Sequence, residues 1–228
     1  MGRSSWHVLQ GEDPAYALPE AAGQCGWVSQ LRPLIVEMTE PGDVVLDPFA
    51  GWGTTLVACA VESRKGIGFE VSPDRAEQAR RRLEAYPGQT MLCADARTPP
   101  LPEESVDFVL ADLPYFGTNL DTDSGVEGQF YALRDYEEYL DALDDAFAAV
   151  TRVMRPGARA VLAVQNRRLG GRFVPLAWDV ARVLGRHLTL GDERIHCYDR
   201  PVSDDDPMVT NRSHEYLLVA AKEPRHAG

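Results

Sequence analysis

The sequence predicts a doubly wound α/β domain, in which helices cover both faces of a mostly parallel β-sheet. Short apolar runs alternate with amphipathic helical stretches along the chain, and two further apolar runs close it. At residues 42–55 an apolar run is followed by a glycine-rich turn and then by a helical stretch. That order is typical of a cofactor site at the carboxyl edge of such a sheet, beside a helix N-terminus. The 228 residues suffice for one domain with a substantial core.

The expected strands are short runs rich in Val, Ile, Leu and Phe, bounded by turn residues. They cover residues 44–46, 65–71, 89–94, 106–111, 158–164, 188–198 and 214–221. The run at 188–198 is long and allows a β-bulge. Most of the first five runs are separated by expected helices, which favours parallel pairing.

Helices are expected where apolar residues recur with the helical period. They cover residues 27–38, 54–61, 72–85, 136–154 and 175–184. The third of these begins with Ser72 and Pro73, which are typical of an N-cap and a first helical position. Four arginines of this helix are expected mostly on its solvated outer faces: Arg75, Arg80, Arg81 and Arg82.

Three segments make up the expected domain organisation. Residues 1–25 form an N-terminal arm without a regular period, residues 26–223 form the folded domain, and residues 224–228 form a short tail. Within the domain, residues 117–134 form a long loop, and loops of that length in compact domains are usually functional.

The composition favours a cytoplasmic protein. No apolar run approaches the ~20 residues of a membrane span, and the first ten residues lack the apolar core of a signal peptide. The cysteines are scattered and the histidines show no ligand spacing, so neither a metal site nor a disulfide framework is expected. The net charge of −12, from 23 basic and 35 acidic residues, counts against tight non-specific binding to DNA.

Two motifs resemble those of the amino-methyltransferases that modify DNA bases, the N4-cytosine/N6-adenine family. Residues 47–55 read Asp-Pro-Phe-Ala-Gly-Trp-Gly-Thr-Thr, which is similar to the family's cofactor loop Asp-Pro-Phe-x-Gly-x-Gly-Thr-Thr. Residues 112–115 read Asp-Leu-Pro-Tyr, which resembles its catalytic motif Asp-Pro-Pro-Tyr with Leu in the second place. The resemblance runs from about Pro19 to Lys222. It implies a three-layer, Rossmann-like class I methyltransferase fold, with seven strands and the last antiparallel.

The cofactor that this resemblance implies is S-adenosylmethionine. The helix N-terminus after Gly53 suits the carboxylate of its methionine part, near Asp47. Glu70 is placed to accept the ribose hydroxyls, or is a surface acid before a turn. Asp95 is placed to accept the adenine amino group, or caps a turn. The expected cofactor-binding residues are Asp47, Pro48, Phe49, Ala50, Gly51, Gly53, Thr54, Thr55, Glu70, Asp95 and Ala96.

The catalytic residues implied by the resemblance are Asp112, Leu113, Pro114 and Tyr115. An exocyclic amino nitrogen is a poor nucleophile because its lone pair is delocalised into the base ring. The Asp112 carboxylate and the Leu113 carbonyl can accept both N–H bonds and turn the lone pair toward the methyl group. Pro114 fixes the turn, and Tyr115 can stack on the ring. Phe116 is expected as the opposite wall of the substrate site.

A cluster of arginines follows the fifth expected strand, at the same edge of the sheet as Asp112. It consists of Arg167, Arg168 and Arg172. These side chains could hold a phosphate or another anionic group of the substrate. An exposed, solvated loop is an equal alternative.

Two kinds of acceptor stay open. The first is a nucleobase in DNA, and since the unassigned loops are too short for a base-reading domain, it implies a specificity partner, a homo-oligomer or relaxed specificity. The second is RNA or a small acceptor, such as a nucleoside, a nucleotide or an amine-bearing natural product, which the negative charge favours. A non-catalytic cofactor-binding subunit is disfavoured by the intact Asp112, Pro114 and Tyr115. A nicotinamide dehydrogenase is disfavoured because Gly-x-Gly-x-x-Gly is missing.

Overall fold

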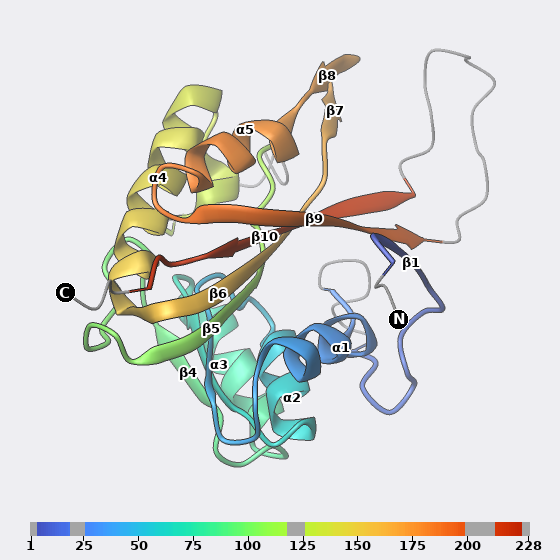
Figure 1. Cartoon of the computed structure of the whole chain (residues 1–228), viewed down its shortest axis with the longest axis vertical. Coiled ribbons are helices and arrows are strands. Elements are labelled where there is room, and N and C mark those ends of the chain that lie inside the picture. Colours follow the sequence, from blue (N-terminus) through green and yellow to red (C-terminus); the bar gives the residue numbers. More distant parts are fainter. Residues whose placement is uncertain (1–3, 19–25, 118–125, 199–212, 225–228) are drawn as a thin grey trace.

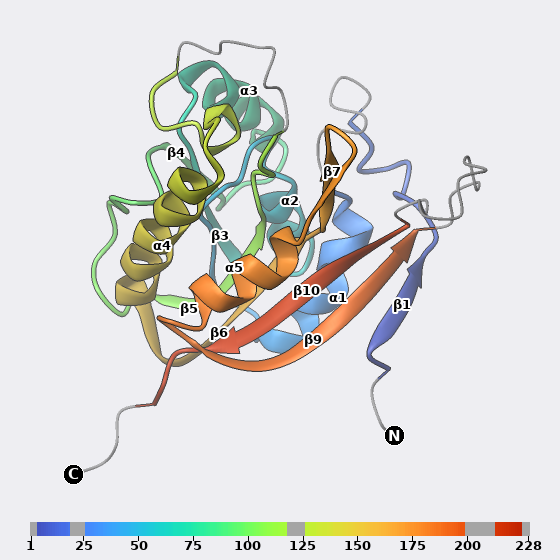
Figure 2. The same ribbon diagram turned by 90° about the horizontal axis from the view of Figure 1, so that it is seen from above.

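The computed structural model describes residues 4–18, 26–117, 126–198 and 213–224. Over these ranges the chain forms an eight-stranded sheet with helices on both faces (Figures 1 and 2). Most of the predicted tail, and parts of the arm and of the loop at 117–134, lie outside the described residues.

The strand order of the sheet is β1-β9-β10-β6-β5-β2-β3-β4. The bounds are Trp6–Leu9 for β1, Val44–Asp47 for β2, Lys65–Glu70 for β3, Thr90–Cys93 for β4, Val106–Asp112 for β5, Met154–Val164 for β6, Thr189–Tyr198 for β9 and His214–Ala221 for β10. Strands β2 to β6 pair in parallel, whereas β10 is antiparallel to both β6 and β9. The carboxyl ends of the parallel strands therefore meet at one edge, and β10 contributes its first residues to that edge.

In the described part of the chain, five α-helices cover the sheet (Figure 1). One face carries α1 (Val28–Met38), α2 (Thr54–Val61) and α3 (Pro73–Leu83), and the other carries α4 (Tyr136–Val153) and α5 (Leu176–Leu184). Each helix buries an apolar stripe against the strands, which gives one core cluster on each side of the sheet. None of the described helices is long and apolar enough to cross a membrane.

The predicted fold class is confirmed, and most expected elements occur within a few residues of their predicted bounds. The helix at 27–38 forms although it contains Pro33. Its N-terminus is capped from the arm, where the Glu12 carboxylate accepts hydrogen bonds from the amides of Val28 and Ser29, at 2.6 and 3.1 Å. The allowed bulge in β9 is confirmed, since the pairing with β10 skips Gly191.

Two segments differ from the prediction. The arm is not wholly irregular, because Trp6–Leu9 pairs in parallel with β9 and adds an eighth strand to the seven expected. The arginine-bearing loop after β6 is a hairpin of β7 (Arg167–Leu169) and β8 (Arg172–Val174). Its turn is formed by Gly170 and Gly171, both at positive φ (+54° and +77°), as a two-residue hairpin turn requires.

Candidate active site

The cofactor loop begins at Asp47, the last residue of β2. Its carboxylate accepts hydrogen bonds from the Phe49 amide at 3.0 Å and from the Thr55 hydroxyl at 2.5 Å. The side chain is 3% exposed, and burial raises the pKa of Asp47 to about 7 although both hydrogen bonds oppose the shift. Asp47 therefore ties the start of the loop to the first turn of α2.

The glycines of the loop let bare backbone turn at the sheet edge. Gly51 and Gly53 have φ of +47° and +76°, and the Gly53 amide donates to the Ala50 carbonyl at 2.7 Å. Among the described residues, a Cβ at Gly51 would have only the Phe49 carbonyl oxygen beside it, at 4.0 Å, so these residues leave open space at the loop. Behind the loop, a Cβ at Gly68 would lie 2.6 Å from the Ala50 Cβ, so this close packing on β3 requires glycine.

The proposed ribose acid, Glu70, ends the neighbouring strand β3. It is 7% exposed, accepts a hydrogen bond from the Ser72 amide at 2.8 Å, and lies 3.7 Å from the Arg75 guanidinium. Burial raises the pKa of Glu70, and the hydrogen bond and Arg75 limit the rise. The Arg75 side chain also donates to the Tyr131 hydroxyl at 3.1 Å, which fixes the segment after residue 125 beside the ribose position.

The proposed adenine acid, Asp95, is engaged by Arg97. The guanidinium and the amide of Arg97 donate four hydrogen bonds of 2.6 to 3.1 Å to its carboxylate. Burial would raise the pKa of Asp95, but these bonds together hold it below its usual value. An adenine amino group would have to compete with Arg97 for this carboxylate, so its role stays a prediction.

Phe49 of the cofactor loop belongs to an apolar cluster with Phe130 and Ala96. Phe49 packs edge-on against Phe130, with ring centroids 5.2 Å apart, and Ala96 is buried beside them at 3% exposure. Phe130 begins a 3₁₀ turn, Phe130–Ala132, and Arg97 lies over its ring. The second half of the loop predicted at 117–134 therefore lies at the proposed adenine end of the site.

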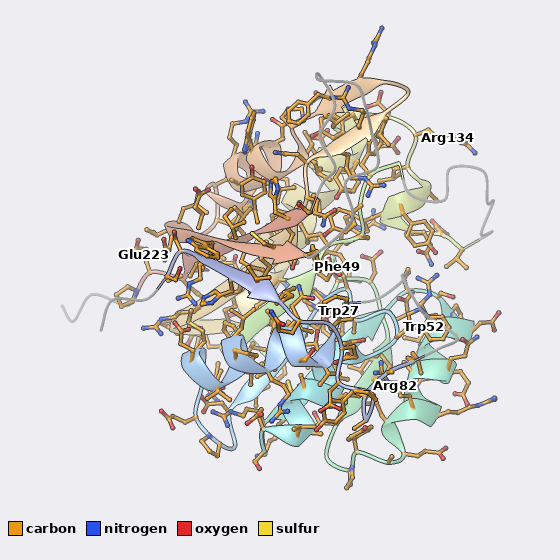
Figure 3. All side chains as sticks on the ribbon, turned by 90° about the vertical axis from the view of Figure 1, so that its right-hand side faces the viewer. Trp27, Phe49, Trp52, Arg82, Arg134 and Glu223 are labelled. Atoms are coloured by element: carbon orange, nitrogen blue, oxygen red, sulfur yellow. The ribbon has the colours of Figure 1, made fainter. Side chains whose placement is uncertain are left out.

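The prediction that the arginines of α3 lie mostly on its solvated outer faces is wrong for Arg75 and Arg82. Besides Arg75, the half-buried Arg82 donates to the Trp52 carbonyl and the Thr54 hydroxyl, both at 3.1 Å, and to the Tyr16 carbonyl at 3.3 Å. Figure 3 shows Trp52 and Arg82 next to one another on the side of the molecule that carries the loop. Arg75 and Arg82 are seven residues apart and therefore lie on one face of the helix. From this spacing the sequence could have predicted that the two side chains share an orientation.

The proposed catalytic motif, residues 112–115, begins at the last residue of β5, the strand beside β2. The Asp112 Oδ1 atom is buried without a hydrogen-bond partner among the described residues. Burial, and next the negative charge of Glu215, raise the pKa of Asp112 to about 8. Asp47 adds to this shift, so the two carboxylates lie close enough to interact. The structure thus brings the ends of both motifs together.

The residues after Asp112 are held firmly. Leu113 is 2% exposed and its amide donates to the Ala163 carbonyl at 3.2 Å, while the Pro114 carbonyl accepts from the Tyr139 hydroxyl at 3.0 Å. Leucine in place of the first proline of the family motif therefore fills the core.

The two aromatic residues of the motif have different surroundings. The Arg167 guanidinium lies over the ring of Tyr115, 5.5 Å from its centroid. Phe116 is 8% exposed and packs against Tyr136 and Tyr139, so it supports the loop from the core side. Its role as a substrate wall stays a prediction.

Of the predicted arginine cluster, Arg167 packs on Tyr115 of the motif. Arg168 and Arg172 are exposed on the hairpin, and Arg168 donates to the Gly171 carbonyl at 2.9 Å. The hairpin itself rests on the motif, since a Cβ at Gly117 would lie 2.6 Å from the Leu169 side chain.

Comparison with known proteins shows which families the chain is similar to. Residues 28–81 match a family model described as DNA methylase. A type II methyltransferase of Citrobacter freundii, M.Cfr9I, is 46% identical over 54 residues, which is 24% of this chain and 18% of that protein. The chain thus spans about a fifth of the length of the curated relative that it matches.

Solved structures extend the likeness to nearly the whole chain, as a fold. TrmN from Thermus thermophilus matches with a TM-score of 0.62 and 22% identity, covering 90% of this chain and 52% of that one. A TehB-like SAM-dependent methyltransferase from Corynebacterium glutamicum matches with a TM-score of 0.58 and 17% identity, covering 90% and 93%.

The residues present fit the cofactor of such proteins. A turn with open space before a helix N-terminus suits a carboxylate, and buried acids at successive strand ends suit a sulfonium and a ribose diol. The chain has the class I methyltransferase fold, and its residues 28–81 are similar to the DNA methylase family of N4-cytosine and N6-adenine methyltransferases.

Proposed function

We propose that the protein is an N-methyltransferase that transfers a methyl group from S-adenosylmethionine to an exocyclic amino group of a nucleobase, of the cytosine N4 or adenine N6 type. The observation that carries this proposal is the buried Asp112 Oδ1 atom, which has no hydrogen-bond partner among the described residues. Leaving such an atom unpaired costs about 1–3 kcal/mol. We infer that a hydrogen-bond donor of the acceptor occupies this place.

The chemistry requires the acceptor nitrogen to present its lone pair to the methyl carbon. Asp112 accepts one N–H bond and the Leu113 carbonyl accepts the other, which draws the lone pair out of the ring plane. Tyr115, held beneath Arg167, stacks on the base and orients it. Bound S-adenosylmethionine supplies a methyl carbon made electrophilic by its sulfonium. After transfer the nitrogen carries a positive charge, and the Asp112 carboxylate accepts its proton.

The cofactor position follows from the acids at the strand ends. We assign the methionine part to Asp47 and the amides that begin α2, the ribose to Glu70, and the adenine to the wall of Phe49 and Ala96. This places the methyl group near the end of β5, where Asp112 lies. The support is the adjacency of β3, β2 and β5 in the sheet.

DNA is the acceptor that the family favours. The net charge of −12 gives the chain little attraction for phosphates. We therefore assign the choice of DNA sequence to a partner subunit or a second copy of the chain, or expect it to be relaxed.

A small acceptor, or RNA, is the second candidate. The observation that favours it is the gathering of acids near this sheet edge: Asp47, Glu70 and Glu215 are buried, and Asp112 is partly buried with its Oδ1 atom fully buried. Such a site suits a neutral or cationic amine better than a polyanion, because buried charges of one sign repel a like charge.

Methyl transfer from tritium-labelled S-adenosylmethionine tests both candidates. The wild-type chain and Asp112→Asn are incubated with duplex DNA, single-stranded DNA, RNA and free nucleosides. We expect label on one acceptor class with the wild type and loss of most label with the variant, at unchanged cofactor affinity. Equal transfer by the variant, or no transfer to any member of the panel, would overturn the proposal.

A further inference from the structure

A second buried carboxylate lies on the same face and edge of the sheet as Asp112. Asp112 pairs with Ala163 of β6, and Ala163 pairs with Leu217 of β10. Residues paired across strands point to the same face, and so do residues two apart in one strand. Glu215, two residues before Leu217, therefore shares a face with Asp112. This face is the one covered by α1.

Glu215 is held in place by three neighbours from two elements. It is 3% exposed, and its Oε1 atom accepts a hydrogen bond from Gln30 Nε2 on α1. His196 Nδ1, from β9, lies 3.4 Å from the same oxygen. Gln30 Nε2 is also 3.4 Å from the Tyr198 hydroxyl, at the end of β9. Burial and the negative charge of Glu215 raise the pKa of Tyr198, so this hydroxyl stays protonated.

Asp112 and Gln30, the residue that donates a hydrogen bond to Glu215, both lie close to Gly26. A Cβ at Gly26 would lie 3.6 Å from Asp112 Oδ2 and 3.8 Å from Gln30 Oε1, so both side chains border one point. Tyr115 lies among the same groups, since Asp112, Glu215 and Tyr198 each raise its pKa in addition to burial. The charged or titratable groups that face Asp112 are therefore Glu215, Asp47, Tyr115 and Tyr198.

We propose that Glu215 is a positioning residue that acts through Asp112, because its negative charge makes the Asp112 carboxylate a stronger proton acceptor. The proposal rests on the methyl transfer proposed above. There, the N–C bond forms as the C–S bond breaks with its electron pair going to sulfur, and the nitrogen then releases a proton. Two like charges that share a buried site raise the proton affinity of one of them. Glu215 thereby prepares Asp112 to take that proton.

The test is a carboxyl-carbon NMR titration of the full chain without acceptor, using protein labelled at Asp Cγ and Glu Cδ. Asp112→Asn assigns the Asp112 signal, which we expect to titrate near pH 8 in the wild type. In Glu215→Gln we expect its midpoint to fall by about one unit or more. The matched control is Glu37→Gln. Glu37 lies on the same face of α1 as Gln30, and the substitution breaks its ion pair with Arg194. It loosens the contact between α1 and β9, and we expect it to leave the Asp112 midpoint in place.

The wild type offers a second measurement that does not depend on the folding of Glu215→Gln. The Glu215 signal should show an inflection at the pH where Asp112 titrates, and Asp112→Asn should remove it. An unchanged Asp112 midpoint in Glu215→Gln, or no shared inflection in the wild type, would overturn the inference. A lowered midpoint in a protein that methylates no acceptor would support the charge coupling and overturn the proposed function instead.

Where an acceptor has been found, the pH profile of kcat gives a functional readout. The acidic limb of the profile should move to lower pH in Glu215→Gln, because a more acidic Asp112 is ionised at lower pH. A purely structural role of Glu215 would lower kcat at every pH and leave the limb in place.

Discussion

Replacing Asp47 with Asn should change how the stability of the protein depends on pH. Asp47 is 3% exposed, and burial raises its pKa from 3.8 to about 7 in the folded chain. Asn has the same shape, and its carbonyl can still accept the hydrogen bond from the Phe49 amide. The substitution therefore removes the ionisation and keeps most of the contacts of the loop.

The size and sign of the effect follow from linkage. The folded chain binds the Asp47 proton more tightly than the unfolded chain does, so this contribution to stability is complete below about pH 4. It is lost as the pH rises through about 7. A shift of about three pKa units corresponds to about 4 kcal/mol at 1.36 kcal/mol per unit. Between pH 4.5 and 7.5 the wild type should therefore lose about 3 kcal/mol of this total that Asp47→Asn does not lose.

Urea unfolding of the cofactor-free protein, followed by circular dichroism at several pH values, measures this difference. Thr55→Val is the companion variant, because it removes the hydroxyl that donates to Asp47 and opposes the raised pKa. In Thr55→Val the loss of stability should extend to higher pH. If the free energies of unfolding of the wild type and Asp47→Asn run parallel across the whole range, Asp47 does not bind a proton with a raised pKa.

Three further predictions concern the site. Glu70→Gln should weaken S-adenosylmethionine binding by about 1–3 kcal/mol, because charge-assisted hydrogen bonds are lost. Calorimetry measures this, with Glu77→Gln at an exposed position as the control, and equal affinities of the two variants would refute the ribose assignment. Arg82→Ala should also weaken cofactor binding, because it removes the hydrogen bonds to the Trp52 carbonyl and the Thr54 hydroxyl of the loop. Arg81→Ala, on the outer face of the helix, should leave cofactor binding unchanged. If both variants bind the cofactor equally well, Arg82 does not order the loop. The isolated chain should bind duplex DNA weakly at about 0.15 M salt, measured by fluorescence anisotropy. Single-stranded bases should be methylated faster than paired ones, because the unstacking cost is absent. Tight, sequence-selective binding of duplex DNA would contradict the charge argument.

The sequence by itself determined the alternation of strands and helices, and with it the position of the site. Apolar runs that end in Asp47, Glu70 and Asp112 are predicted to be strands of a mostly parallel sheet, and the carboxyl ends of parallel strands share one edge. No tertiary information is needed for that inference, because each strand and its following turn are encoded locally. The family motifs at 47–55 and 112–115 lie on two of these ends.

Tertiary structure decided which side chains complete the site. Gln30 and Glu215 are 185 residues apart, and they meet only because β10 inserts between β6 and β9 with one particular register. A shift of one residue would turn Glu215 to the other face. Arg82 reaches the loop only through the packing of α3 on the sheet. Contacts of this kind depend on register and on the docking of helices, which no local pattern of residues encodes.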